Sequence, residues 1–177
     1  VNRKNLARTS SAPGKTRLLN FYRIEAALDQ TAVAWYYVDL PGYGYARVSK
    51  AERAGWLNLM DAYLRVERPR LIWQLVDIRH QPSEQDVAMR QALLARGCSI
   101  VTVANKADKL SRNARLKALK LIAATLELPP SEIVVFSAIS REGREQLLAI
   151  SEAFLRQQPA AAAPGPEETG AADAERE

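Results

Sequence analysis

The stretch SIVTVANKADKL at residues 99–110 decides the fold, because a short and uniformly apolar run is followed at once by a polar loop. An apolar run of this length, without alternation, is typical of a strand that is buried on both faces of a parallel sheet. Two further runs of this kind, LIWQLVD and EIVVF, occupy residues 71–77 and 132–136. Helix-like segments separate these runs, and the alternation predicts an α/β fold with a mostly parallel sheet and helices on both faces.

The remaining elements follow from apolar periodicity and from turn and capping residues. Two strands, at 16–26 and 33–39, are expected to be joined by a turn around Asp29-Gln30. Ser49 is expected to cap a helix over residues 50–66, since a glutamate follows three residues later. Three more helices are predicted over residues 83–96, 111–127 and 142–156.

Composition limits the class of protein. The chain has 177 residues, of which 47% are hydrophobic and 25% charged, as in an ordinary soluble globular domain. No apolar run approaches the ~20 residues of a membrane span and no signal-peptide pattern is visible, so a cytoplasmic location is expected. The single cysteine, Cys98, excludes a disulfide within the chain.

Charge is unevenly distributed between a basic body and an acidic tail. Residues 159–177 hold five acidic side chains and one arginine, a net charge of −4, which leaves +9 on residues 1–158 within a chain total of +5. The basic body could bind RNA through its phosphates, or its charge could simply be solvated. The tail, residues 157–177, is rich in Ala, Pro, Gly and Glu and is expected to be disordered, so that the folded domain covers residues 1–156.

The loop Asn105-Lys106-Ala107-Asp108 has the chemistry needed to read a guanine base. The Asp108 carboxylate can accept hydrogen bonds from N1–H and the 2-amino group of guanine, a pair of donors that adenine lacks. Asn105 can donate to the base edge, and the stem of Lys106 can lie flat on the ring. Taken alone, the tetrapeptide could equally be a polar surface turn.

Two further loops each follow a predicted strand, at the end where α/β sheets bind ligands. In Asp39-Leu40-Pro41-Gly42, the Asp39 carboxylate can hold Mg²⁺ through a water, and Gly42 lets a backbone N–H approach a terminal phosphate; a simple turn is the alternative. After the strand that ends at Phe136, the backbone N–H groups of Ser137-Ala138 could donate to guanine O6. The order of the three loops favours a GTP-binding domain.

Four segments carry a resemblance to the EngB family of bacterial ribosome-biogenesis GTPases. They are NRKNLARTSSAPGKTRLLNFY (2–22), VDLPGYGYARVSKAER (38–53), VDIRHQPSEQD (76–86) and NKADKL (105–110). The resemblance implies a GTPase switch that assists assembly of the large ribosomal subunit, with a link to cell division and septation. It also implies GTP or GDP as ligand, Mg²⁺ as cofactor and the large subunit or its rRNA as partner, with no membrane or DNA partner.

The same resemblance assigns two switch loops. Switch I is matched by Gly14, Lys15, Thr16, Arg17 and Leu18. Within it, the residue at the position of Thr16 binds Mg²⁺ and senses the γ-phosphate. Switch II is matched by residues 39–45, and both loops are ordered by the γ-phosphate and Mg²⁺ and released on hydrolysis.

The phosphate-binding P-loop is expected to be missing from this chain. Residues 9–16, TSSAPGKT, imitate the pattern G-x-x-x-x-G-K-[ST], but Thr9 stands where the first glycine belongs and a polar stretch precedes the segment. In the family, the P-loop and the first strand come before the position that matches Val1, and that strand lies between those at 33–39 and 71–77. An N-terminally truncated GTPase domain is therefore expected.

The residues of catalysis are less defined than those of binding. Tyr43 stands where Ras-like enzymes place a glutamine that orients the attacking water, so slow intrinsic hydrolysis is expected and no catalytic residue is assigned. His80, the only histidine, is expected to have a structural role in its loop. The cluster of Trp35, Tyr36, Tyr37, Tyr43 and Tyr45 is expected to be mostly strand core. Two alternatives stay open: a module that binds rRNA or the ribosome without nucleotide, and an inactive fragment.

Overall fold

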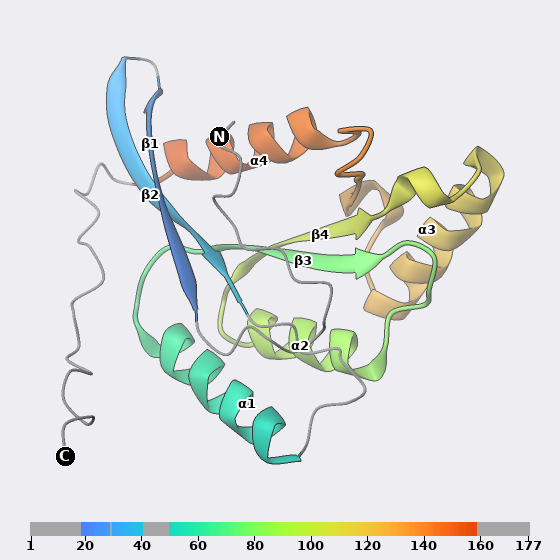
Figure 1. The fold of residues 1–177 in the computed structure, drawn as a ribbon, viewed down its shortest axis with the longest axis horizontal. Coiled ribbons are helices and arrows are strands. Elements are labelled where there is room, and N and C mark those ends of the chain that lie inside the picture. The colour runs from blue at the N-terminus through green and yellow to red at the C-terminus, as the bar shows by residue number, and fades with distance from the viewer. Residues whose placement is uncertain (1–18, 29, 41–49, 159–177) are drawn as a thin grey trace, which may run out of the picture.

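Three parallel strands, in the order β3-β4-β5, form the main sheet of the computed structural model, which describes residues 19–28, 30–40 and 50–158. The strands are β3 (Leu71–Asp77), β4 (Ser99–Asn105) and β5 (Ile133–Val135). Helices α2 (Glu84–Leu94) and α3 (Arg112–Leu126) lie on one side of this sheet, and α4 (Arg144–Arg156) lies on the other (Figure 1). The predicted α/β architecture, with a parallel sheet covered by helices on both faces, is confirmed.

Strand β4 is buried on both of its faces. Val103 packs with Val134 and with Leu147 of α4, whereas the neighbouring Ala104 belongs to the cluster on the opposite face, with Ile122 of α3. Both Val103 and Ala104 are fully buried. Since successive side chains of a strand point to opposite faces, two covered faces favour apolar residues at successive positions. This preference explains the uniform run from which the strand was predicted.

Strands β1 (Asn20–Leu28) and β2 (Thr31–Asp39) form an antiparallel hairpin. Their pairing runs from Asn20 opposite Asp39 to Leu28 opposite Thr31, which leaves two residues for the turn, and Gln30 has a φ of 68°. Such left-handed values are typical of two-residue hairpin turns, and the predicted turn around Asp29-Gln30 is confirmed in position. The predicted end of the first strand at residue 26 is two residues too early, because pairing continues through Leu28.

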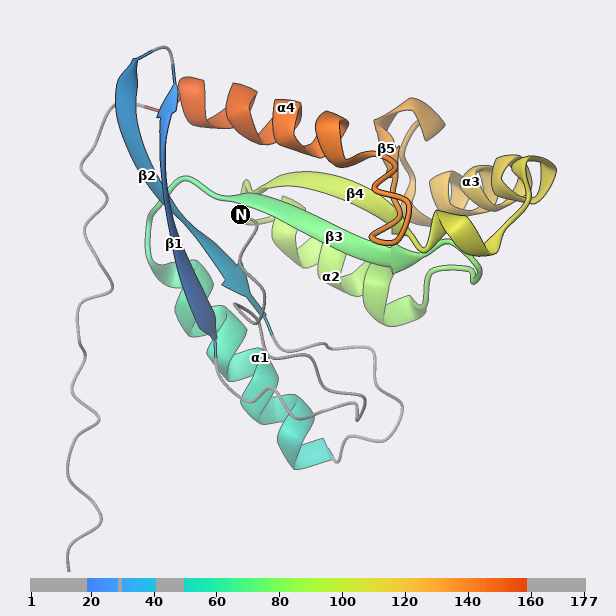
Figure 2. The same cartoon turned by 45° about the horizontal axis from the view of Figure 1, so that its top comes forward.

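The hairpin and the parallel sheet are separate sheets, which corrects the expectation of a single mostly parallel sheet containing residues 33–39. Among the described residues, β2 is hydrogen-bonded to β1 and β3 to β4, with no ladder between β2 and β3. Side chains make the contact instead: the rings of Tyr37 and Trp73 lie 5.5 Å apart. Figures 1 and 2 show the hairpin strands running steeply across the direction of β3.

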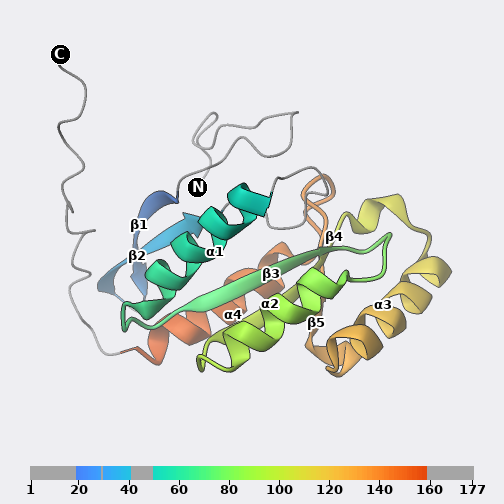
Figure 3. The same ribbon diagram turned by 90° about the horizontal axis from the view of Figure 1, so that it is seen from below.

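The aromatic residues of the hairpin pack on both of its faces. Trp35 meets Tyr37 edge-on at 6.3 Å, on the face that reaches Trp73. On the other face, Phe21 lies 6.2 Å from Tyr36 and 6.3 Å from Tyr63 of α1 (Lys50–Arg65), which lies alongside the hairpin (Figure 3). Burial raises the pKa of Tyr37. Trp35, Tyr36 and Tyr37 pack against neighbouring rings but are only half-buried and lie outside the buried core, so the predicted core role holds only in part. The switch-loop members of the cluster, Tyr43 and Tyr45, lie outside the described residues.

The helices begin and end close to the predicted residues. Ser83 and Asp86 form a reciprocal capping box at the start of α2, and Gly97, at a φ of 69°, follows its end. Ser111 caps α3, whereas Ser49, the predicted cap of α1, lies outside the described residues. Two short 3₁₀ turns, η1 (Ala107–Lys109) and η2 (Pro130–Glu132), complete the elements. Within the described ranges, no helix is both long enough and apolar enough to cross a membrane.

Candidate functional site

The predicted base-reading loop follows β4 directly and is attached to the end of β5. The backbone N–H of Phe136 donates to the carbonyl of Ala104 at 2.9 Å, and the N–H of Ala107 donates to the carbonyl of Phe136 at 3.0 Å. Between them, Lys106 has φ 65° and ψ 34°, a left-handed conformation that costs a non-glycine residue about 1–2 kcal/mol. The loop is therefore held in one unusual shape by its neighbouring strand.

A side-chain hydrogen bond joins the second and third predicted loops. The Ser137 hydroxyl donates to Asp108 Oδ1 at 2.7 Å and accepts from the backbone N–H groups of Ile139 and Ser140 at 3.2 and 3.1 Å. Ser137 is fully buried, so its hydroxyl keeps these partners. Its hydrogen bond lowers the pKa of Asp108, against the opposing effect of desolvation, and Lys109 Nζ lies 3.3 Å from Asp108 Oδ2. Asp108 therefore presents an ionised, oriented carboxylate.

The backbone of the Ser137-Ala138 loop differs from the sequence-based expectation in one respect. The N–H of Ser137 donates to the carbonyl of Glu142 at 3.1 Å, so this donor serves the loop itself. The N–H of Ala138 has no hydrogen-bond partner within the part of the chain that the structure describes. Of the two donors predicted for guanine O6, Ala138 is thus the one that is not already engaged.

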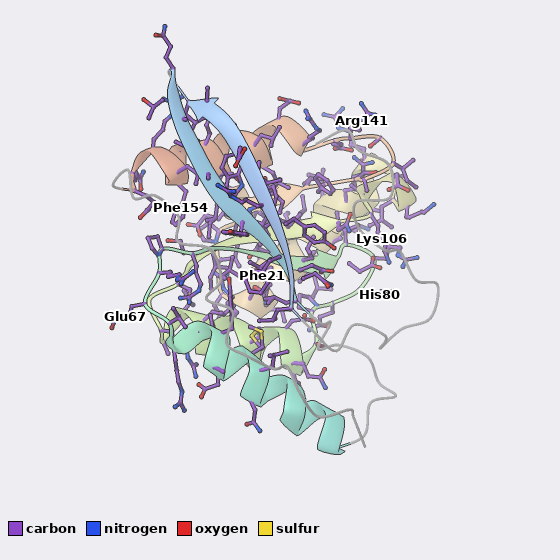
Figure 4. All side chains as sticks on the ribbon, turned by 60° about the vertical axis from the view of Figure 1, so that its left-hand side comes forward. Phe21, Glu67, His80, Lys106, Arg141 and Phe154 are labelled. Carbon is purple, nitrogen blue, oxygen red and sulfur yellow. The ribbon has the colours of Figure 1, made fainter. Side chains whose placement is uncertain are left out.

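The two polar side chains at the start of the base-reading loop also have defined partners. Asn105 Oδ1 accepts the backbone N–H of Lys106 at 2.7 Å, which leaves the amide N–H₂ to donate elsewhere. Lys106 Nζ donates to Asp77 Oδ2 at 2.9 Å. Figure 4 shows Lys106 at the same edge of the molecule as His80 and Arg141, with Glu67 and Phe154 at the opposite edge.

Two interactions at this edge were missed by the sequence analysis. Asp77 binds Arg79 as well as Lys106, and Arg115 Nη1 donates to both carboxylate oxygens of Glu142 at 2.9 Å. Asp77 ends an apolar strand just as Asn105 does, so the same rule could have found it. The Arg115–Glu142 pair spans 27 residues and has no sequence signal.

His80 lies in the loop directly after β3, and the structural role expected of it stays a prediction. Its backbone N–H donates to the carbonyl of Asp77 at 3.1 Å, which closes a turn directly after β3. The His80 side chain is exposed.

The remaining predicted site residues are only partly described. Asp39 is exposed as the last residue of β2, followed by half-buried Leu40, and within the described ranges no hydrogen bond or ion pair joins Asp39 to the loops at 105–108 and 136–138. No group of three or more His, Cys, Asp or Glu side chains able to hold a metal ion occurs among the described residues. The predicted residues outside the described ranges are Gly14, Lys15, Thr16, Arg17, Leu18, Pro41 and Gly42.

The sequence of this chain is similar to those of known GTP-binding proteins. The family model described as "50S ribosome-binding GTPase" matches residues 1–106. The "Probable GTP-binding protein EngB" of Syntrophomonas wolfei is 52% identical over 149 residues, which are 84% of this chain and 73% of that protein. The protein of the same name from Bacillus subtilis is 41% identical over 148 residues, 82% of this chain and 72% of that protein.

Solved structures show the same fold at lower identity. A crystal structure of "a probable GTP-binding protein engB" has a TM-score of 0.62 at 18% identity and covers 84% of this chain and 88% of its own. The structure of Era in complex with MgGDPNP and nucleotides 1506–1542 of 16S ribosomal RNA has a TM-score of 0.65 at 19% identity, over 86% of this chain and 49% of Era. The fold is that of the P-loop GTPases, and the sequence relationships show that the chain belongs to the EngB family of GTP-binding proteins.

Proposed function

We propose that this chain binds GTP and GDP through the loops at the ends of β4 and β5. The observation that carries the proposal is the 2.7 Å hydrogen bond from Ser137 to Asp108. It orients an ionised carboxylate beside an unengaged backbone N–H at Ala138. This pairing of an acceptor with a nearby donor complements the Watson–Crick edge of guanine.

Each group in the loop has one task in this proposal. Asp108 accepts from N1–H and the 2-amino group, while the Ala138 N–H donates to O6. Adenine would place its own amino group against that donor and would offer no donor pair to Asp108. Asn105 donates through its amide, and the stem of Lys106 covers one face of the ring.

The phosphate side of the site is proposed from the family pattern. Gly14, Lys15, Thr16, Arg17 and Leu18, together with Leu40, Pro41 and Gly42, would surround the γ-phosphate. Thr16 would bind Mg²⁺ directly and Asp39 through a water; both offer the oxygen ligands that this ion prefers, and Asp39 is exposed at a strand end. Bound Mg²⁺ supplies charge neutralisation for the phosphates. With Tyr43 in place of a water-orienting glutamine, GTP hydrolysis by this protein would be slow without a partner.

We propose further that a P-loop GTPase sheet built on this pattern has a further strand between β2 and β3. Strand β3 is apolar almost throughout, yet one of its edges is unpaired among the described residues, and Leu75 on this strand is 57% exposed. A strand between β2 and β3 would pair both free edges. The family pattern places a strand and a P-loop there, upstream of the position of Val1. Reading the genomic DNA upstream in frame tests this, and a stop codon with no G-x-x-x-x-G-K-[ST] pattern would refute it.

The cellular role that fits best is assistance in assembly of the large ribosomal subunit, with an effect on cell division and septation. The matching family is described as ribosome-binding, and the net charge of +9 on residues 1–158 suits an RNA partner. In this proposal residues 1–156 form the GTPase domain, residues 157–177 form an acidic tail, and the protein acts in the cytoplasm.

Titration with fluorescent GDP, and with ADP in the same assay, tests the proposed nucleotide site. Guanine-selective binding that responds to Mg²⁺ is expected, and Asp108→Ala should abolish the selectivity. Asp61→Ala is the matched control, because the carboxylate of Asp61, on α1 and outside the proposed site, is engaged by Arg65 of the same helix and by Arg96 after α2. Salt-sensitive RNA binding without any guanine preference would instead support the nucleotide-independent module.

A further inference from the structure

Asp77 stands at the point where the main sheet meets the proposed base-reading loop. It is the last residue of β3 and lies opposite Asn105, the last residue of β4. Its Oδ1 accepts from Arg79 Nε at 2.8 Å and from the Arg79 backbone N–H at 3.1 Å. Its Oδ2 accepts from Arg79 Nη2 at 2.6 Å and from Lys106 Nζ at 2.9 Å. The Asp77 carboxylate therefore forms a bidentate pair with the Arg79 guanidinium and, at the same time, an ion pair with Lys106 of the loop.

The ammonium group of Lys106 is held by this contact with Asp77. Lys106 has a left-handed backbone that its neighbours impose, and its side chain is 50% exposed. A half-exposed lysine samples many rotamers, and confining such a side chain costs up to about 2 kcal/mol of rotamer entropy. Asp77 is the only ion-pair partner of Lys106 among the described residues, and it is itself only 24% exposed.

Arg79 keeps Asp77 both ionised and oriented. The Arg79 guanidinium beside it holds the pKa of Asp77 well below the ordinary range, and the pKa of Arg79 is raised in return. Two positive charges and one negative charge leave this trio with a net positive charge. The carboxylate therefore adds no uncompensated negative charge next to the site proposed for a nucleotide anion.

We propose that Asp77, itself oriented by Arg79, is a positioning residue that holds the Lys106 stem in the place where it covers the guanine ring. Asp77 acts through Lys106 and touches no nucleotide. The proposal rests on the guanine-binding function proposed above and assigns a task to the motif Asp77-Ile78-Arg79-His80. Its consequence is that part of the nucleotide affinity comes from a residue outside the base-reading loop.

A double-mutant cycle on the full chain tests this coupling. The variants are Asp77→Asn, Lys106→Met and the combination, with fluorescent GDP as the probe and thermal unfolding as the check on folding. Methionine keeps an unbranched apolar stem without the charge. In the wild-type background Asp77→Asn is expected to weaken GDP binding by about three- to tenfold, as for a partly exposed ion pair. In the Lys106→Met background the same substitution should change the affinity by less than about twofold.

Two further variants separate positioning from a general structural effect. Asp61→Asn also removes a carboxylate shared by two cationic side chains, Arg65 and Arg96, but on α1, and should leave GDP affinity unchanged. Asp77→Glu keeps the negative charge and should recover part of the lost affinity. If Asp77 only supports the turn after β3, Asp77→Glu is not expected to recover GDP affinity.

The outcomes are distinct. If wild-type protein shows no preference for GDP over ADP, the proposed function fails and the role of Asp77 fails with it. If wild-type protein binds GDP selectively but Asp77→Asn weakens binding equally in both backgrounds, only the positioning role is overturned. A loss confined to the background that contains Lys106 supports it.

Discussion

The Ser137 hydroxyl donates a 2.7 Å hydrogen bond to Asp108, a residue 29 positions earlier in the chain. The two residues follow different strands, β4 and β5, which pair in parallel with Ala104 opposite Val135. Their loops meet because the carboxyl ends of parallel strands lie at the same edge of a sheet. Ser137 thereby orients the carboxylate proposed to read guanine and lowers the pKa of Asp108.

Ser137→Ala is expected to move the acid limit of GDP binding to higher pH. The Ser137 hydroxyl lowers the pKa of Asp108, so in the wild type this carboxylate stays ionised at a lower pH than an ordinary aspartate would. Without the hydroxyl, Asp108 becomes protonated and stops accepting at a higher pH as the solution is acidified. The measurement is GDP affinity from neutral pH down to about pH 4. Ser140→Ala, in the same loop without a contact to Asp108, is the control; overlapping pH profiles for the two variants would contradict the role of Ser137.

Asp108→Asn is expected to change the base that is preferred. The amide still accepts from N1–H but presents an N–H donor where the carboxylate accepted the 2-amino group, and this suits the 2-carbonyl of xanthine. GDP affinity should fall by roughly 10²-fold or more while xanthosine diphosphate becomes the better ligand. Competition between the two diphosphates measures this. Unchanged GDP preference would remove Asp108 from the base-reading role.

Gly143→Ala is expected to destabilise the protein by about 2–4 kcal/mol. Gly143 has a φ of 76°, and a Cβ there would lie 2.1 Å from the carbonyl oxygen of Val135. Gly97, at a φ of 69°, has nothing within 4 Å of an added Cβ, so Gly97→Ala should cost only the conformational term of about 1 kcal/mol. Gly55 lies in helix α1 with open space around it, so Gly55→Ala should raise the free energy of unfolding by about 0.5–1 kcal/mol. Chemical denaturation of the three variants measures the free energies of unfolding, and equal losses at Gly143 and Gly97 would rule out the clash.

Arg115→Met is expected to loosen the connection between the two site loops. Arg115 Nε donates to the carbonyl of Leu110 at 3.0 Å, and Nη1 donates to Glu142. Loss of these bonds from a side chain that is 26% exposed should lower the free energy of unfolding by about 1–2 kcal/mol and weaken GDP binding by a few fold. The matched change at exposed Arg112, on the same helix, should affect neither quantity; similar losses at both positions would show that helix composition, and not the loop connection, matters.

Local sequence patterns were sufficient to predict the helices and strands and to name the loops that we propose carry the chemistry. The uniform apolar run of β4 requires burial on two faces, and this alone indicates a parallel strand with a ligand edge beyond Asn105. The hairpin followed from two β-branched and aromatic runs separated by Asp29-Gln30, and the capping residues Ser83 and Ser111 are local signals. These features depend on neighbours within a few residues.

The precise site depended on contacts that no local pattern contains. The partner of Asp108 is 29 residues away, the ion pair of Lys106 with Asp77 also spans 29, and the pair of Arg115 with Glu142 spans 27. Which of these side chains meet is determined by the adjacency of β3, β4 and β5. The separation of the hairpin from the parallel sheet could not be predicted from local patterns either, because it depends on which distant segments pair with each other. The sequence by itself thus determined the chemistry available at each strand end, and the tertiary structure alone decided how those groups are paired, because packing and strand register bring distant residues within hydrogen-bonding distance.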